Sequence, residues 1–257
     1  MPELSVVIPL YNEEQNLSKL SERLLGVLEG LSIPYEIIFV DDGSSDQTLA
    51  MLEELAGSNP YIRAISLTRN FGHQAALMAG LDHADGDAVI TMDGDLQDPP
   101  ELIPQLLEKW KEGFQVVYAR RRNFRHDHFM KRWLSMLFYF TIRAFKMTTA
   151  PKTVGDFRLV DQRVLAELRN MRERTRYLRG MVSWLGFRHD FVDYDRPDRA
   201  DGKAGYSFSQ LMKLALDGFF SFSRVPLRIG LFLGVISIFI GLGFMVYMIA
   251  DILINDV

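Results

Sequence analysis

The sequence predicts an α/β protein with a mostly parallel sheet and an apolar helix near its C-terminus. Between residues 4 and 92, short apolar runs alternate four times with helical patterns, which is typical of a parallel sheet covered by helices. A separate run at 229–250 carries no charge over about 22 residues, enough to cross a bilayer. The 257 residues carry a net charge of −4 and include no cysteine, which indicates one large domain without disulfides or thiolate chemistry.

Five apolar segments have the length of buried strands, and they occupy residues 4–9, 35–40, 62–67, 87–92 and 115–119. Helical patterns at 12–29 and 71–83 follow the first and third segments. Asn12 is the expected N-cap of the first helix, because acidic residues fill the turn after it. After the fourth strand, a pair of prolines ending at Pro100 is expected to stop the strand and start a helix at Glu101.

The fourth strand leads into two carboxylates, Asp93 and Asp95, which are one residue apart. Ligands of open parallel sheets bind at the carboxyl ends of the strands, and alternate residues of a strand point the same way. Both carboxylates are therefore expected to face one hard cation, Mg²⁺ or Mn²⁺, which takes oxygen ligands and also holds substrate phosphates. Gly94 would let a ligand approach the backbone closely. For this D-x-D pattern alone, the alternative is a solvated acidic turn.

Polar side chains also follow the first two strands, at Tyr11, Asp41 and Asp42. Connections in parallel sheets are right-handed, so these loops should gather at one edge with the D-x-D pair and share one crevice. Chance placement of acidic residues is the alternative. The first turn has no glycine-rich phosphate loop, which argues against a dinucleotide-dependent dehydrogenase or a P-loop NTPase.

Three segments in combination resemble family 2 glycosyltransferases of the polyisoprenyl-phosphate type, such as bactoprenol glucosyltransferases and dolichol-phosphate mannose synthases. They read V-I-P-L-Y-N-E at 7–13, V-D-D-G-S at 40–44 and D-G-D-L-Q-D-P-P-E at 93–101. The resemblance covers nearly the whole chain. It implies a GT-A fold and an inverting transfer of a hexose from a nucleotide-diphosphate sugar to a polyisoprenyl phosphate. UDP-glucose and undecaprenyl phosphate are the expected substrates, and GDP-mannose is the alternative donor.

The resemblance also implies roles for individual residues. Arg120 aligns with an arginine that the family keeps after the fifth strand, and G-D-F-R-L at 155–159 matches an element beside the acceptor site. Arg158 is expected to bind a phosphate through two hydrogen bonds, whereas Asp156 either orients an arginine, contacts the sugar or helps to activate the acceptor. A surface ion pair is the alternative for both. The expected metal and diphosphate ligands are Asp93, Asp95 and Gln97. The other expected substrate contacts are Pro9, Tyr11, Glu13, Val40, Asp41, Asp42, Gly94, Arg121, Arg199 and Lys203.

The loop at 199–206 departs from the family's R-x-x-G-x-S-K-Y pattern, because it reads R-A-D-G-K-A-G-Y. Ala204 and Gly205 stand where many members have serine and lysine. Lys203 is the candidate replacement for the missing cation, and the departure leaves open which group holds the donor diphosphate from this side.

The expected acceptor needs little help from a base. A phosphate monoester has a second pKa of about 6, so it is largely an anionic nucleophile at neutral pH. The enzyme must instead position this anion next to the anionic donor, and a group of arginines suits that task. A metal ion and nearby cations would stabilise the charge that develops on the leaving nucleoside diphosphate.

The charges around the apolar run predict its orientation. Arginines precede the run and only aspartates follow it, so the N-terminal part should be cytoplasmic and the C-terminus outside. A basic and aromatic helical pattern at about 127–146 is expected to lie in the membrane interface, with a core helix as the alternative. The expected organisation is a catalytic domain, an amphipathic juxtamembrane helix, a span and a short outer tail, at 1–205, 206–224, 225–250 and 251–257.

A small-residue pattern in the span, Gly230 and Gly234 followed by Ser237, predicts close helix packing. The partner would be another copy of the chain, giving a homo-oligomer, or a second span, and whether such a span is missing from this chain stays open. Glycine is also common in membrane helices, which is the alternative explanation.

Two other classes of protein are alternatives to the transferase. A processive polysaccharide synthase would carry a Q-x-x-R-W element and several spans, and the sequence shows neither. A membrane scaffold without activity would be expected to have lost a metal carboxylate, and both are present. The expected partners are a nucleotide sugar, a polyisoprenyl phosphate and the membrane, and no nucleic acid.

Overall fold

The structure is a computed structural model that describes residues 2–122, 154–171, 178–195 and 225–255. The chain forms two compact units, which are treated separately: the described residues up to 195 belong to the first, and 225–255 to the second. Several sequence predictions lie outside the described residues. They are the helices at 127–146 and 206–224, the loop at 199–206 with Arg199 and Lys203, and the domain boundary at 205.

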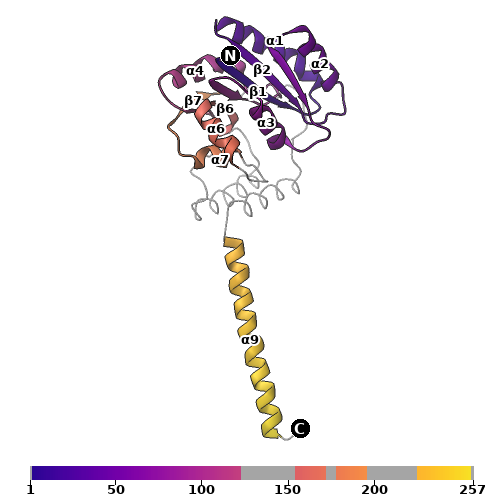
Figure 1. Cartoon of the computed structure of the whole chain (residues 1–257), viewed down its shortest axis with the longest axis vertical. Helices are drawn as coiled ribbons and strands as arrows, with labels where there is room; N and C mark the ends of the chain where they lie inside the picture. The colour runs from indigo at the N-terminus through magenta and orange to yellow at the C-terminus, as the bar shows by residue number, and fades with distance from the viewer. Residues whose placement is uncertain (1, 123–153, 172–177, 196–224, 256–257) are drawn as a thin grey trace. The chain divides into compact units, whose positions relative to one another are not determined.

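The described strands of the first unit form one seven-stranded sheet in the order β3-β2-β1-β4-β6-β5-β7 (Figure 1). All neighbours are parallel except β6, which runs antiparallel to β4 and β5. The strands are β1 (Leu4–Leu10), β2 (Tyr35–Asp41), β3 (Ile62–Ser66), β4 (Ala88–Thr91), β5 (Val116–Arg121), β6 (Val154–Asp161) and β7 (His189–Tyr194). The five strands predicted from apolar runs are therefore present in a mostly parallel sheet, and β6 and β7 extend it.

Helices cover both faces of this sheet. Buried leucines of α1, α2 and α4 pack on one face, and buried residues of α3, α6 and α7 pack on the other. Both faces of β1 are buried, which explains why its sequence is an almost continuous apolar run. The helices are α1 (Glu14–Gly30), α2 (Thr48–Ser58), α3 (His73–Asp82), α4 (Ile103–Lys111), α6 (Gln162–Asn170) and α7 (Leu178–Trp184), with a 3₁₀ turn η1 (Pro100–Leu102) before α4.

Two predicted helix starts need correction. Glu13, not Asn12, precedes α1, because Asn12 adopts a left-handed backbone with φ of 55° and its side chain accepts a hydrogen bond from Ser45 N instead. The helix expected from Glu101 begins two residues later, because Pro100 first opens the 3₁₀ turn η1.

The helix α3 lies unusually close to the sheet. A Cβ atom added at Gly80 would lie 2.3 Å from Val7 Cγ1 and 2.9 Å from Val40 Cγ2, so only glycine allows this approach to β1 and β2. The N-terminal turn of α3, with His73 and Gln74, is thereby held at the edge of the sheet where the parallel strands end.

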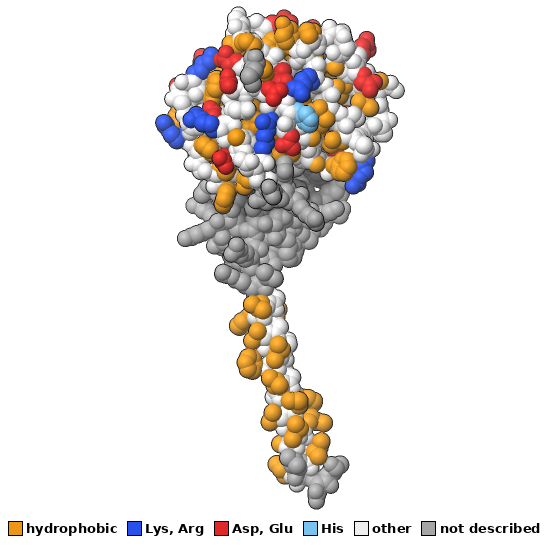
Figure 2. Space-filling view, in the orientation of Figure 1, with side chains coloured by type: hydrophobic (Ala, Val, Ile, Leu, Met, Phe, Trp, Pro, Cys, Tyr) orange, Lys and Arg blue, Asp and Glu red, His pale blue; other side chains and the backbone are white. Residues whose placement is uncertain are grey.

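The described part of the second unit is α9 (Val225–Asn255). Its segment Gly230–Ile252 has a mean hydropathy of 2.4, so α9 is long and apolar enough to cross a membrane, by length and composition. Large apolar side chains are exposed along it, as Figure 2 shows. The sequence prediction of one C-terminal apolar helix is confirmed. The helix packing predicted at Gly230 and Gly234 stays a prediction: a Cβ at either would have no neighbour within 4 Å among the described residues.

Candidate active site

The two aspartates at the end of β2 are buried and hold loops rather than facing solvent. Asp42 is 3% exposed, and its carboxylate oxygens accept hydrogen bonds from Phe71 N at 2.8 Å and Gly72 N at 2.9 Å. Asp41 is 1% exposed and accepts from Ser44 N at 3.2 Å. Asp42 therefore fixes the segment from which α3 starts, while Asp41 shapes the turn that follows β2.

The loops after β1 and β2 are tied to each other. Ser44 Oγ accepts a hydrogen bond from Asn12 N at 2.9 Å, and Thr48 Oγ1 accepts one from Glu13 N at 2.9 Å. Tyr11 stands 46% exposed at this edge. Among the predicted nucleotide contacts, Tyr11 and the half-buried Glu13 are accessible, whereas Pro9 and Val40 are buried within β1 and β2 and support the loops from below.

The D-x-D pair lies beyond β4 rather than on it, which corrects the expectation that strand alternation aligns the two carboxylates. The strand ends at Thr91, and the backbone then turns, with Leu96 at φ of 60° and Asp95 Oδ1 accepting a hydrogen bond from Gln97 N at 3.1 Å. A Cβ at Gly94 would lie 2.2 Å from Leu10 Cδ2, so this glycine lets the loop pack on β1. Gln97 is 7% exposed.

A buried cluster on the other side of this loop holds Asp93 in place. Asp98 is fully buried; its Oδ2 accepts a hydrogen bond from Asp93 N at 3.2 Å, and its Oδ1 accepts one from the Tyr194 hydroxyl at 2.8 Å. Arg121 lies 3.6 Å from Asp98 Oδ1 and donates to the Tyr194 oxygen at 3.1 Å. Arg121, predicted as a substrate contact, is thus placed beneath the D-x-D loop.

A second cluster surrounds Asp156, which is 2% exposed on β6. Its Oδ1 accepts hydrogen bonds from Arg158 and from Arg179 Nε, the latter at 3.1 Å. Its Oδ2 has three neighbours: Arg179 Nη2 at 2.8 Å, His73 Nε2 at 3.4 Å and Gln74 Nε2 at 3.4 Å. His73 Nε2 also lies 3.5 Å from Asp93 Oδ1, which links this cluster to the D-x-D loop.

The charges of this cluster shift the pKa values of its acids and of His73. Burial alone would raise the pKa of Asp156, but the hydrogen bond with His73 and the charges of Arg179 and Arg158 hold it well below its usual range. Burial would lower the pKa of His73, yet its contacts with Asp156 and Asp93 raise it. Burial and then the charge of Asp98 raise the pKa of Asp93 to about 6.

The residues around Asp93 fit a divalent cation. Asp93 Oδ1 is buried and accepts no hydrogen bond from the described residues, which a carboxylate oxygen tolerates when a cation completes its shell. The ligand atoms of His73, Asp93 and Asp156 lie within 4.8 Å of one another. The carboxylate oxygens of this group suit Mg²⁺ and Mn²⁺, whereas the imidazole nitrogen of His73 is a softer donor. The predicted set of Asp93, Asp95 and Gln97 shares Asp93 with this group. His73, which the sequence did not indicate, contacts both Asp93 and Asp156 through its Nε2.

The predicted acceptor arginines have different surroundings. Arg158 is fully buried between Asp156 and the Tyr118 ring, so it is not the surface ion pair weighed as an alternative. Arg120 is 41% exposed, pairs through two hydrogen bonds with Asp193 and stacks 4.7 Å above the Phe191 ring. A ligand of Arg158 would therefore compete with Asp156, and a ligand of Arg120 would compete with Asp193.

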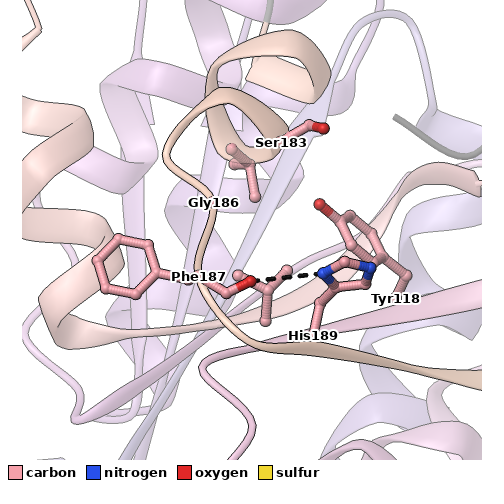
Figure 3. A pocket seen from close by; sticks show the side chains of 7 residues that line it. Tyr118, Ser183, Gly186, Phe187 and His189 are labelled. Carbon is pink, nitrogen blue, oxygen red and sulfur yellow. Dashed lines mark hydrogen bonds between the residues drawn. The ribbon is translucent and has the colours of Figure 1, made fainter. Parts of the chain in front are cut away.

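A small cavity lies on the α7 side of the sheet, between β5, α7 and β7 (Figure 3). Among the described residues its wall includes no carboxylate, lysine or arginine, so these residues offer neither the carboxylate ligands nor the phosphate-binding cations expected of the site. His189 Nδ1 lies 3.4 Å from Phe187 O. Figure 3 marks this contact with a dashed line and shows the His189 ring beside Tyr118. The cavity is therefore not included in the candidate active site.

Sequence reasoning missed His73, Gln74, Arg179 and Tyr194. Asp98 was part of the recognised D-G-D-L-Q-D-P-P segment, but no role was given to it. A signal for His73 existed, because a polar first turn of the helix after β3 belongs at the same edge as the strand ends. Tyr194 carried no such signal, since its partner Asp98 is 96 residues away.

The chain as a whole matches known proteins. The family model described as glycosyl transferase family 2 matches residues 5–169. The chain is 45% identical to an uncharacterised glycosyltransferase of Synechocystis, over 96% of this chain and 78% of the relative. It is 39% identical to the prophage bactoprenol glucosyl transferase homolog of Escherichia coli, over 98% of this chain and 82% of the relative. Among solved structures, glucosyl-3-phosphoglycerate synthase of Mycobacterium tuberculosis, in complex with Mn²⁺, UDP and phosphoglyceric acid, superposes with a TM-score of 0.55, 18% identity, and coverage of 84% and 75%.

These findings define an enzyme that transfers glycosyl groups on a GT-A fold. The chain belongs to glycosyl transferase family 2. The resemblance noted in the sequence is thereby confirmed, together with the fold and the enzyme class.

Proposed function

We propose that this protein transfers a hexose, with inversion, from UDP-glucose to a polyisoprenyl phosphate such as undecaprenyl phosphate. The observation that carries the proposal is the similarity over 98% of the chain to a relative named for bactoprenol glucosyl transfer, combined with an acidic site at the carboxyl edge of the sheet. GDP-mannose is the alternative donor, since the described contacts do not distinguish the two nucleotides.

The carboxylates at the carboxyl edge would bind the donor. Asp93 and Asp95, with Gln97, would hold Mg²⁺ or Mn²⁺, and such an ion stabilises negative charge on the leaving nucleoside diphosphate. Tyr11 and Glu13 would contact the nucleotide, because they are accessible on a loop that Ser44 and Thr48 tie to the segment after β2. This division leaves the arginine-rich side, around β5, β6 and α7, for the acceptor phosphate.

The proposed location is the cytoplasmic face of a membrane, with α9 as the span. Its apolar segment has the required length, and a lipid acceptor would have to be met at the membrane surface. Association of spans through Gly230 and Gly234 into a homo-oligomer remains part of the proposal.

The test is sugar transfer by the purified full chain in detergent. The chain is incubated with a short-chain polyprenyl phosphate, Mg²⁺ or Mn²⁺, and either UDP-glucose or GDP-mannose, each labelled in the sugar. Label should move to the lipid fraction with UDP-glucose and stay in water when the metal is chelated. If transfer occurs only with GDP-mannose, then GDP-mannose and not UDP-glucose is the donor. No transfer to lipid phosphate with either nucleotide sugar would refute the proposal.

A further inference from the structure

The Asp156 carboxylate lies at the centre of a cluster of side chains that contact both of its oxygens. Five contacts from four side chains converge on its two oxygens, from Arg158, Arg179, His73 and Gln74. A carboxylate in this state is a weak proton acceptor, because each of these contacts favours the ionised form. Of the roles open to Asp156, orienting an arginine agrees best with this geometry.

The two arginines of the cluster differ in accessibility. The Arg158 side chain is fully buried, whereas the side chains of Arg179 and His73 are each 35% exposed. Arg179 Nη2 and His73 Nε2 both contact Asp156 Oδ2, so one carboxylate oxygen brings them together. Arg158 and Arg179 carry two positive charges against the one on Asp156, and the second nearby carboxylate, Asp93, lies 3.5 Å from His73 Nε2.

The position of Arg179 is fixed by α3. Gln74 Oε1 accepts a hydrogen bond from Leu178 N at 3.0 Å, which ties the start of α7 to the first turn of α3. The same turn presents His73 to Asp93. A ligand at Arg179 and His73 would therefore lie beside the carboxylate expected to hold the metal.

We propose that Arg179 and His73 bind a phosphate group of a substrate beside Asp93, and that Asp156 is a positioning residue that holds both side chains in place. A guanidinium matches a phosphate in charge and in hydrogen-bond geometry. The inference rests on the proposed function for the source of the phosphate, which is either the lipid acceptor or the donor diphosphate. It moves the phosphate contact expected at the buried Arg158 to the accessible Arg179.

The test compares Arg179→Ala and Arg179→Lys with a control, Arg163→Ala, in the full chain in detergent. Arg163 also pairs with an aspartate, Asp161, but it lies on α6 and its side chain is 70% exposed. Calorimetry measures the Kd of UDP with Mg²⁺ and the Kd of a short-chain polyprenyl phosphate, and transfer assays measure kcat and both KM values. Binding needs no turnover, so a failure of the proposed transfer would be seen separately in the wild-type assay.

Arg179→Ala is expected to weaken one of the two ligands about 10- to 100-fold, as the loss of charged hydrogen bonds predicts. Weaker lipid phosphate binding with unchanged UDP binding assigns the acceptor, and the reverse assigns the donor. The affinity of Arg179→Lys should lie between those of wild type and Arg179→Ala. If the alanine variant does not fold, the lysine variant is compared with wild type instead. Affinities within about twofold of the Arg163→Ala control for both ligands would overturn the inference.

The positioning role of Asp156 has its own readout. Asp156→Asn should weaken binding of the same ligand as Arg179→Ala does. The double variant should bind this ligand no more weakly than the more impaired single variant, because both changes remove the same contact between Arg179 and Asp156. A fall in kcat with unchanged Kd and KM values would instead indicate that Asp156 acts as a base, and would overturn this part.

Discussion

The carboxylates in the parallel half of the sheet are held mainly by backbone N–H groups, whereas those in the mixed half are held by arginine side chains. Asp42, after β2, accepts from Phe71 N and Gly72 N. Asp156, on the antiparallel β6, is surrounded by Arg158 and Arg179. Backbone donors fix a carboxylate without adding a full positive charge, while arginines bring one each. The comparison suggests an acidic half suited to a metal and nucleotide, and a basic half suited to a second anion.

The comparison predicts its largest effect at the D-x-D loop, where the two halves meet. Asp95→Asn removes a charge from the expected metal site, and it should lower transfer about a hundredfold or more while the fold persists. The measurement is the initial rate of transfer across a titration of Mg²⁺ and of Mn²⁺.

Asp85→Asn provides a matched control for this change. Asp85 precedes β4 as Asp95 follows it, and its side chain is 60% exposed beside Arg63. This variant should transfer at the wild-type rate. Near-normal activity of Asp95→Asn with added metal would remove Asp95 from the site.

Much of the parallel half could be predicted from the sequence, because its information is local. The strand β1 is a continuous apolar run buried on both faces, and the loops after β1, β2 and β4 follow from strand direction. The mixed half could not be predicted in the same way. The insertion of β6 between β4 and β5 depends on pairings such as Thr91 with Arg158, which no local pattern encodes.

The candidate site shows the same limit. The D-x-D carboxylates and the aspartates after β2 stood out as polar residues at strand ends. The contact of Arg179 with Asp156 and that of Tyr194 with Asp98 depend on chain packing, and their partners are 23 and 96 residues away. Asn12 was misassigned because its side chain bonds to Ser45 in a neighbouring loop rather than to its own helix.

The two halves of the sheet should differ in how much stability depends on their carboxylates. Asp42→Ala would leave the N–H groups of Phe71 and Gly72 without the acceptor that the buried Asp42 carboxylate supplies. The free energy of unfolding should fall by about 1–3 kcal/mol. Asp193→Ala, which breaks the exposed pair with Arg120, should cost clearly less, because exposed ion pairs contribute little. Urea denaturation of the full chain in detergent measures both, and equal losses would contradict the contrast between the halves.

The smallest expected effect concerns Glu36, a carboxylate of the parallel half. It accepts hydrogen bonds from a hydroxyl, a backbone N–H and an arginine. It is 8% exposed and accepts from Ser5 Oγ at 2.6 Å, Asp85 N at 2.8 Å and Arg63 Nη1 at 2.8 Å. Burial alone would raise the pKa of Glu36, but these hydrogen bonds and the Arg63 charge lower it below its ordinary value.

A pKa that is lower in the folded state contributes stability above the unfolded pKa of about 4.3, and this contribution is lost as the pH falls through the folded pKa. The urea midpoint of Glu36→Gln should therefore lie below that of wild type near pH 7, and the difference should shrink as the pH falls toward about 3. Glu53→Gln, an exposed change on α2, should show no such pH-dependent difference. A difference for Glu36→Gln that stays constant over this pH range would show that the ionised carboxylate is not what stabilises this edge, because the loss would then not depend on the charge of Glu36.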